Sequence, residues 1–263
     1  MMRRLSATAC ALAALLATDG PAAAEKLVTS ISRHQVLVNS SFTGTSIVLF
    51  GTVEPDGPSP RRRSTGYDVI VTVTGPKESV VERRKERVLG IWTNVTSRVF
   101  VEVPSYLAVL STQPFNRITN DETIKRLQIG IDNIPLRQQA QPTKDGADLG
   151  RDDVFRANFI RLKTQHRLYL QKTNGVTLLT SAVFRAEIPL PAEAPIGTYE
   201  VDVKVFAEGA MIVRAASAFE IVKTGFEQFV ANVAQEHGLL YGIATAMMAL
   251  MTGWFASVVF RRD

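Results

Sequence analysis

The sequence predicts a mainly β protein, an Ig-like antiparallel β-sandwich with an inserted helical pair, followed by one C-terminal transmembrane helix. Three observations carry this prediction. Short segments of alternating apolar and polar residues recur between glycines and prolines, two helix-like stretches interrupt them, and an uncharged apolar run closes the chain. Two small β domains joined by helices are the alternative arrangement.

The alternation is clearest in TYEVDVKVF, where Val201 and Val203 alternate with Asp202 and Lys204. Because successive side chains on a strand point to opposite faces, the valines are expected in the core and the charged residues outside it. Half-buried strands at such regular spacing are typical of a sandwich. The same pattern predicts strands over 67–74, 98–106 and 182–188, and shorter ones over 35–38, 46–50 and 218–222.

Two amphipathic segments interrupt the strands, within an insertion covering about 118–172. The first, ITNDETIKRLQIGI, has Thr119 and Glu122 in the spacing of a capping box. A polar connector follows, and Asp152 or Asp153 can then cap DVFRANFIRLKTQHRLYLQ, whose apolar residues recur on one side of a helix. A pair of helices is therefore expected here.

The second predicted helix also carries the candidate binding residues. Arg156, Lys163 and Arg167 flank its apolar stripe, so this face could dock a partner or an anionic substrate. His166 falls within the stripe itself. We expect it to be a core histidine with a hydrogen-bond partner, since buried polar groups are generally paired.

The first 24 residues have the plan of a signal peptide, with a basic start, a short apolar run and an Ala-rich cleavage site. The run is too short to cross a bilayer, which argues against an uncleaved first membrane helix. Cleavage would leave 25–225 as a periplasmic domain. Cys10, the only cysteine, lies in the leader, so the mature chain is expected to contain no disulfide and no cysteine-bound metal.

Residues 238–260 contain no charged side chain and are long enough, at 1.5 Å per residue, to span a membrane as one helix. They follow a juxtamembrane segment, 226–237. Arg261 and Arg262 fit the positive-inside rule, which makes 261–263 a cytoplasmic tail. We therefore expect a single-pass protein of the inner membrane with a periplasmic N-terminal domain and a cytoplasmic C-terminus.

Small residues recur every four positions along this segment, and such rows let membrane helices approach closely. The alternative is that Gly and Ala are simply common in membrane helices. The candidate helix-packing residues are Gly238, Gly242, Ala246, Ala249, Gly253 and Ser257.

Charge and motifs restrict the function. The leader and the tail each contribute +1 to the formal charge of +5, leaving +3 on the domain, without the concentrated basic footprint of a nucleic-acid-binding module. The three histidines lack metal-ligand spacing, and neither a nucleophile elbow nor a phosphate-binding glycine loop occurs. The sequence thus predicts a non-enzymatic protein without a cofactor, metal or nucleic-acid partner.

Three stretches point to a family: SSFTGTSIVLFG, FIRLKTQHRLYLQKTNGVTLLTSAVFRAEIPLPAEAPIGTYEVDVKVF and the juxtamembrane LLYG. They resemble an uncharacterised family of alpha-proteobacterial transmembrane proteins, over nearly the whole mature chain. The resemblance implies a leader, an extracytoplasmic domain, one C-terminal helix and a gene neighbour encoding a sulfite-exporter-like permease. It assigns no functional residues.

Three functional hypotheses follow. The leading one is a membrane protein whose periplasmic domain binds a partner, as an accessory subunit of a sulfite-exporter-like permease. The second, from a different class, is a membrane-tethered periplasmic hydrolase or ligand-binding domain whose site is assembled from distant residues; a deep polar pocket with convergent histidines or carboxylates would favour it. The third is an envelope protein that self-associates through its transmembrane helix.

Overall fold

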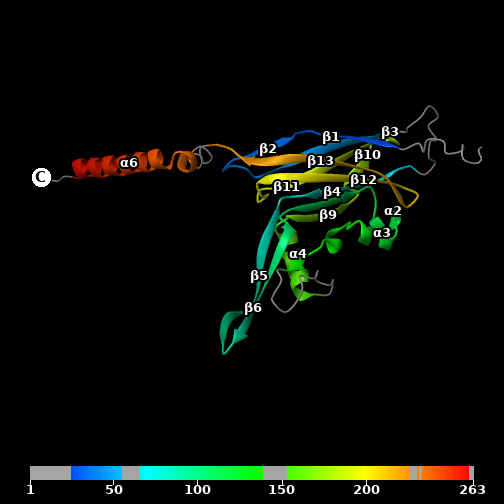
Figure 1. Cartoon of the computed structure of the whole chain (residues 1–263), viewed down its shortest axis with the longest axis horizontal. Helices are drawn as coiled ribbons and strands as arrows, with labels where there is room; N and C mark the ends of the chain where they lie inside the picture. The colour runs from blue at the N-terminus through cyan, green and yellow to red at the C-terminus, as the bar shows by residue number, and fades with distance from the viewer. Residues whose placement is uncertain (1–24, 55–65, 139–152, 226–229, 231–232, 261–263) are drawn as a thin grey trace, which may run out of the picture.

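The computed structural model describes residues 25–54, 66–138, 153–225, 230 and 233–260. It shows three β-sheets, a few helices and one C-terminal apolar helix (Figure 1), which confirms the predicted mainly β class. Several predicted segments lie outside the described residues. They are the signal peptide (1–24), the connector (139–152), much of the juxtamembrane segment and the tail (261–263).

Two sheets form a sandwich. One has the strand order β1-β3-β11-β10 and the other β2-β13-β12-β4-β7-β9. The first comprises β1 (Lys26–Ile31), β3 (Gly44–Glu54), β11 (Val183–Pro191) and β10 (Val176–Leu178). The second comprises β2 (Gln35–Val38), β13 (Ala210–Lys223), β12 (Gly197–Ala207), β4 (Asp68–Thr74), β7 (Leu107–Ser111) and β9 (Tyr169–Thr173).

The sandwich is antiparallel as predicted except at the edges of the larger sheet. There β2 pairs with β13, and β7 with β9, in parallel. Parallel neighbours need a long crossover connection, and the helices between β7 and β9 provide one. Alternation within a strand reports burial and not strand direction, which is why the sequence did not predict these two pairs.

The core between the two sheets contains the alternating valines of β4 and β12, as predicted. Tyr106 joins the sheets by donating from its hydroxyl to the Pro189 carbonyl on β11, at 2.5 Å. Tyr199 stacks on Phe219 with ring centroids 5.0 Å apart and donates to the Pro195 carbonyl, four residues upstream, at 2.7 Å. A tyrosine bonded in this way is compatible with an Ig-like sandwich.

The outer face of the larger sheet is also covered, and a second core lies beneath it. The cover consists of α2 (Phe115–Ile118), α3 (Asp121–Arg126), η1 (Ile131–Asn133) and α4 (Val154–Gln165), which lie between β7 and β9 in the chain. Ile70, on the outward side of β4, is consequently fully buried. Phe159 of α4 packs edge-on against Tyr169 and tilted against Phe100.

The helix boundaries differ in two ways from the sequence prediction. Asn120, and not Thr119, caps α3, because its side chain accepts from the Thr123 amide while the Thr119 hydroxyl donates to the Gly209 carbonyl. Asp153 caps α4, but this helix ends at Gln165 and the chain turns at Arg167, whose φ is +56°. The residues that follow form β9 instead of continuing the helix.

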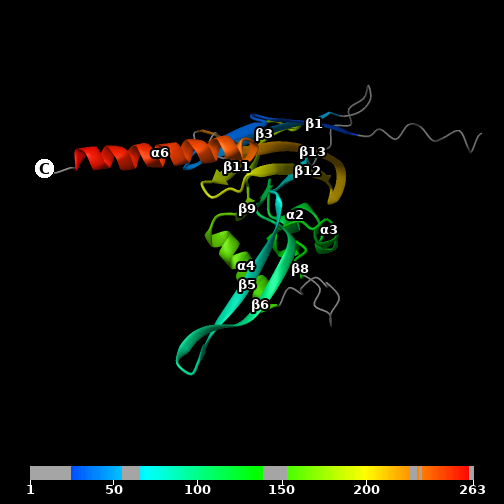
Figure 2. The ribbon, with the colours of Figure 1, turned by 60° about the vertical axis from the view of Figure 1, so that its left-hand side comes forward.

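The third sheet is mainly a long hairpin of β5 (Lys77–Val88) and β6 (Ile91–Pro104), joined by the short β8 (Arg137–Gln138) near the hairpin's base. Beyond β8, these two strands pair with no other strand in the part of the chain that the structure describes. The hairpin projects away from the sandwich in both views (Figures 1 and 2). The sequence ERRKER, which we interpret from its mixed charges as an exposed strand edge or turn, lies on β5.

Among the described residues, one helix is long and apolar enough to cross a membrane. This is α6 (Gly238–Val259), which matches the predicted span to within one residue. None of its residues is buried against the other described residues of the protein.

Candidate functional site

The three cations predicted to form one binding face on α4 do not do so. Arg156 is only 3% exposed, and its guanidinium donates to the carbonyls of Asp132 and Ile134, at 2.9 and 2.7 Å. It therefore ties α4 to the segment around η1. A helical wheel places Arg156 on a flank, and the neighbouring segment that covers this flank could not be inferred from sequence spacing.

Lys163 and Arg167 differ in their surroundings, because the first is paired inside the protein and the second is exposed. The Lys163 ammonium pairs with Glu78 of β5 at 2.5 Å and lies 5.7 Å from the centroid of the Phe159 ring. Its side chain is only 13% exposed. Arg167 is exposed at the end of α4. The prediction of one anionic-ligand face is thus corrected, because Arg156 and Lys163 serve internal contacts.

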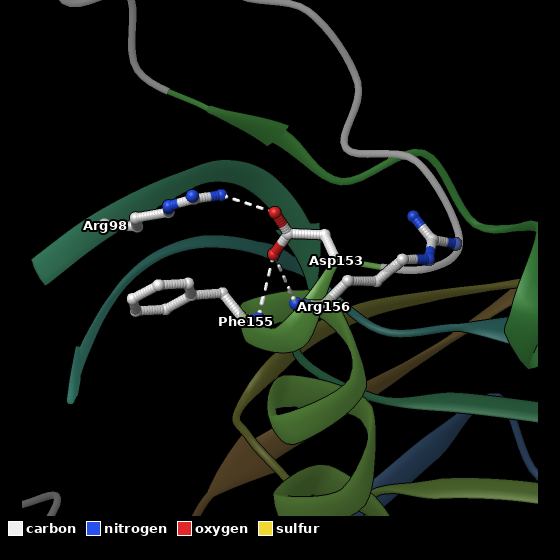
Figure 3. A network of polar contacts seen from close by, with 4 residues as sticks. All are labelled: Arg98, Asp153, Phe155 and Arg156. Atoms are coloured by element: carbon white, nitrogen blue, oxygen red, sulfur yellow. Dashed lines mark hydrogen bonds and ion pairs between the residues drawn. The ribbon is translucent and has the colours of Figure 1, made fainter.

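The N-terminus of α4 fastens the hairpin to the domain (Figure 3). Asp153 accepts from the Phe155 and Arg156 amides, at 2.8 and 3.3 Å, and from the Arg98 guanidinium of β6, at 2.8 Å. Burial works to raise the pKa of Asp153, but the hydrogen bonds from Arg98 and the two amides outweigh it and lower the pKa. Arg98 also lies over the Phe155 ring, 4.5 Å from its centroid.

Glu82 lies beside this network, directly across from Arg98 in the hairpin. Burial, followed by the negative charge of Asp153, raises the pKa of Glu82 to about 7. One of its carboxylate oxygens is buried without a hydrogen-bond partner among the described residues. The carboxyl group is therefore easier to protonate in the folded protein than in the unfolded chain, where its ordinary pKa is 4.5.

Glu82→Gln should make the protein more stable at pH 8 and leave it unchanged near pH 4. Because the pKa of Glu82 is raised in the folded protein, the stability that its protonated form contributes is fully present below pH 4.5. This stability is lost as the pH rises to about 7. The variant, which cannot ionise, escapes this loss. Urea unfolding of the full chain in detergent at both pH values measures it, and equal effects of the substitution at the two pH values would contradict the assignment.

His166 is exposed, which corrects the prediction of a core histidine, because α4 ends just before it. It does have the expected partner, since its Nδ1 lies 3.0 Å from a Glu193 carboxylate oxygen. The two side chains border a cleft of about 750 Å³ between the end of α4 and the end of β11. Both are more than half exposed to solvent.

A second cleft, of about 510 Å³, lies between the outer face of the larger sheet and the layer formed by α3, η1, β6 and β8. We refer to it as the basic cleft. Five cations and two carboxylates line it, which leaves an excess of three positive charges. The charged residues are Lys77, Arg126, Arg137, Lys204, Arg214, Glu102 and Asp202.

The pairing of β12 with β13 places three of these residues together. Lys204 lies directly across from Arg214, and like charges at such positions repel. Asp202 resolves the conflict, because its carboxylate accepts from both the Lys204 ammonium and, at 2.6 Å, the Arg214 guanidinium. The hydrogen bond and charge of Asp202 raise the pKa of Arg214. Two cations thus share one carboxylate at the floor of the cleft.

Other polar groups of the basic cleft are not engaged within the protein. In the part of the chain that the structure describes, neither Lys77 nor Arg126 forms a side-chain hydrogen bond or ion pair. The hydroxyl of Thr72, which also lines the cleft, is buried and has no hydrogen-bond partner among the described residues. Cations and a hydroxyl donor around a small cleft are suited to bind an oxyanion, since both donate hydrogen bonds to anionic oxygens.

The sequence reasoning missed this cleft because its charged residues come from six different elements. Alternation on β12 correctly placed Asp202 and Lys204 on the face opposite the valines. However, it could not show that this face is covered, which leaves Lys204 only 5% exposed. The only sign of the cleft in the sequence was that Thr72, Asp202 and Lys204 all lie on the outward faces of two predicted strands. Among the described residues, no group of three or more His, Cys, Asp or Glu side chains could hold a metal ion.

The candidate helix-packing residues all lie on α6. Apart from the adjacent backbone of α6 itself, a methyl group added at Gly238, Gly242 or Gly253 would meet no described atom within 4 Å. The structure thus leaves these rows uncovered by the described residues of the chain itself. A family model described as "Putative transmembrane protein (Alph_Pro_TM)" matches residues 26–262. The chain belongs to this family.

Membership of Alph_Pro_TM and the uncovered apolar helix α6 together make this a membrane-anchored protein. The match extends over both sheets of the sandwich, the hairpin and the anchor, so the Alph_Pro_TM family shares the β domain as well as the helix. No curated protein matches the chain.

Proposed function

We propose that this membrane-anchored protein is a non-enzymatic binding subunit that holds an inorganic oxyanion close to the membrane surface. In this proposal the β domain is periplasmic, α6 crosses the inner membrane once, and the protein serves a sulfite-exporter-like permease as an accessory subunit. The permease is the one implied by the family resemblance.

The basic cleft is the observation that carries the proposal. Its excess of positive charge includes two cations, Lys77 and Arg126, without partners among the described residues. Cations that line one cleft repel each other unless solvent or an anion compensates them. A volume of about 510 Å³ accommodates a small oxyanion with part of its hydration shell.

The position of the basic cleft in the fold also favours a role near the membrane. Lys77 is the first residue of β5, and Pro76 just before it lies 3.1 Å from a methyl group built on Gly197. Gly197 is the first residue of β12 and pairs with Ile221, close to the end of β13. Because β13 ends at Lys223 and α6 begins at Gly238, only a short segment separates them, and one margin of the cleft lies at the membrane-proximal end of the domain.

The partner in the membrane would be recognised by α6. Its small residues let a neighbouring helix approach closely, and van der Waals packing of this kind drives helix association in lipid. Gly242 and Gly253 lie in the two rows and are open in the structure. A multi-spanning permease offers many helices for such a contact.

Lys77→Ala combined with Arg126→Ala should weaken sulfite or sulfate binding at least tenfold, because each charge-assisted hydrogen bond contributes about 1.5 kcal/mol or more. Isothermal titration of the detergent-solubilised full chain at low salt measures this. Arg185→Ala, at an exposed position on β11, serves as the control and should bind like the parent. Absence of binding by the parent, or equal binding by the double variant and the control, contradicts an oxyanion role for the cleft.

The permease association has its own test. The chain, tagged at its C-terminus and purified in mild detergent, should retain a permease in equal amounts. Gly242→Leu with Gly253→Leu should release it, because the larger side chains keep helices apart. If the parent chain purifies alone, an accessory role is excluded, and if only copies of itself are cross-linked, the envelope-protein hypothesis takes its place.

A hydrolytic function is the second candidate, and the His166–Glu193 pair favours it. A carboxylate that orients a histidine is half of a general-base arrangement, and the hydroxyls of Thr43 and Thr164 border the same cleft. Ester or phosphate-ester hydrolysis that is lost in His166→Gln would support this function over a binding subunit.

A further inference from the structure

We propose that the tip of the β5–β6 hairpin inserts into the outer surface of the lipid bilayer that α6 crosses, and that it prefers anionic lipids. The tip consists of residues 88–92. This inference does not depend on the oxyanion cleft or on a permease. It rests on the composition, position and support of the hairpin.

The tip exposes apolar side chains without any cover from the described residues. Leu89 is 99% exposed, Ile91 72% and Trp92 69%. A soluble hairpin tip is ordinarily polar, because the turn is surrounded by water. Several large apolar residues gathered on one projection indicate a surface that meets something apolar.

The turn at the tip contains a residue that this type of turn disfavours. Leu89 and Gly90 link the strands as a two-residue loop, with φ of +50° and +87°. Such turns favour Asn-Gly or Asp-Gly, because branched and bulky residues are strained at positive φ. Leucine at the first position therefore does not stabilise the turn, and its side chain is almost completely exposed. We take this as evidence that the leucine serves an external contact.

Cations surround the apolar tip on the β5 side. From residue 83 to the turn the chain carries Arg83, Arg84, Lys85 and Arg87, with Glu86 as the one carboxylate, bound to Arg84 at 3.0 Å. Trp92 lies directly across from Arg87. Tryptophan is enriched at the membrane interface, and basic residues beside it attract anionic headgroups. The end of the hairpin thus combines exposed apolar residues, a tryptophan and cations, the residue types that meet a membrane surface.

The hairpin starts at the end of the domain that lies nearest to α6 in the chain. Its first residue, Lys77, follows Pro76, which contacts Gly197 at the end of the sheet where β13 finishes. In both views the hairpin runs downward, away from the axis of α6, and its tip lies below the end of the domain from which α6 extends (Figures 1 and 2). The twelve residues of β5 extend roughly 40 Å at about 3.3 Å per residue, a length that carries the tip well away from the sandwich.

The direction of the hairpin is held at its base. Arg98 on β6 is bound to the cap of α4 (Figure 3), and Glu78 on β5 is bound to Lys163 near the end of the same helix. Two ion pairs from the two strands to one helix restrict how far the hairpin can swing. An apolar tip on a supported arm of this kind is arranged to touch a surface at a fixed distance from the domain.

Trp92 provides a direct test, because the chain has only one other tryptophan, Trp254 in α6. The full chain with Trp254→Phe is placed in lipid nanodiscs whose scaffold protein carries no tryptophan and which contain no other membrane protein. Phosphatidylglycerol-containing discs with brominated acyl chains should quench Trp92 emission and protect it from aqueous acrylamide. In discs of phosphatidylcholine alone, or at high salt, the quenching should be weaker.

Two variants separate the apolar and electrostatic parts. Leu89→Asn with Ile91→Thr should abolish quenching while preserving the hairpin, because asparagine is favoured at positive φ in this turn. Removing cations, in Arg83→Gln with Arg84→Gln, should reduce the ratio of inserted to free tips about fivefold for each charge. Leu179→Asn, at an exposed residue of the β10–β11 loop, is the matched control and should quench like the parent.

The proposal is overturned if Trp92 in anionic discs stays open to acrylamide and is not quenched by brominated lipid. A Trp92 that is protected from acrylamide without bromine quenching would be buried against a second copy of the chain, which also overturns it. Neither result would affect the titration of the basic cleft or the retention of a permease, so the two proposals fail independently.

Discussion

Replacing Gly51 by alanine should lower the free energy of unfolding by roughly 3 kcal/mol. Gly51 lies on β3 directly across from Phe184 of β11, in the middle of the smaller sheet. A methyl group at this position would lie 2.1 Å from the ring Cζ of Phe184 and 2.6 and 2.8 Å from two further ring carbons. Phe184 is completely buried, so its ring has no open space to turn into.

The loss of stability should arise from the steric clash with Phe184 and not from backbone strain, because Gly51 does not have a positive φ. Gly51→Ala combined with Phe184→Leu should therefore cost less than the sum of the two single substitutions, by about 1 kcal/mol or more. Ser46→Ala, at an exposed position of the same strand, is the control and should change stability by about 0.5 kcal/mol or less. Urea unfolding of the full chain in detergent measures all four, and a Gly51→Ala protein as stable as the Ser46→Ala control would contradict this packing.

Gly51 illustrates what the sequence could and could not predict. Alternating residues and the apolar C-terminal run predicted the strands, the mainly β class and α6, because burial on one face and membrane length are local properties of the chain. The contact between Gly51 and Phe184 joins strands far apart in sequence. Such contacts depend on the strand order, which alternation does not specify.

The hairpin and the second core were missed for a related physical reason. ERRKER carries charges on both faces of β5, because most of it is exposed and, of the described residues, only the first part of α4 borders it, near Glu82. It therefore lacks the period of two that marks a half-buried strand. In contrast, β4 and β12 are covered on both faces. Their outward residues include the apolar Ile70 as well as the expected polar ones, among which Lys204 is buried. A residue pattern reports how polar a face is, but not which distant segment packs on it.

The same limit applied to the candidate sites. Helical spacing grouped Arg156, Lys163 and Arg167, yet two of them bind groups from η1 and β5 that no helical wheel contains. The basic cleft combines Lys77, Arg126 and other cations whose proximity exists only in the folded chain. Functional clusters built from many elements are thus the part of this protein that the sequence predicts least.

Arg156→Met should destabilise the protein by about 3 kcal/mol. The guanidinium of Arg156 is almost fully buried and donates to two carbonyls, of which that of Ile134 is in a buried bond at 2.7 Å. A methionine fills a similar length of space, so the substitution removes the donors with little cavity. The acceptors belong to the backbone and remain, and a buried acceptor without a donor costs about 1–3 kcal/mol.

A buried cation is itself costly to remove from water, so its replacement by an apolar side chain could in principle stabilise the fold. That outcome requires the partners to be replaced as well, and here the carbonyls of Asp132 and Ile134 cannot be. We therefore expect the loss of the hydrogen bonds to dominate. Arg161→Met, at an exposed position of the same helix, should change stability by about 0.5 kcal/mol or less.

Urea unfolding of the two variants shows whether the lost hydrogen bonds outweigh the relief of no longer burying a charge. Hydrogen exchange shows which segment is destabilised. In Arg156→Met the amides of 129–136 should exchange faster, because this segment loses the contacts that hold it to α4. Stability equal to that of the Arg161→Met control would show that burial of the charge cancels its hydrogen bonds. Arg156 would then be free to vary without loss of fold, and the segment around η1, which borders the basic cleft, would be positioned by the second core alone.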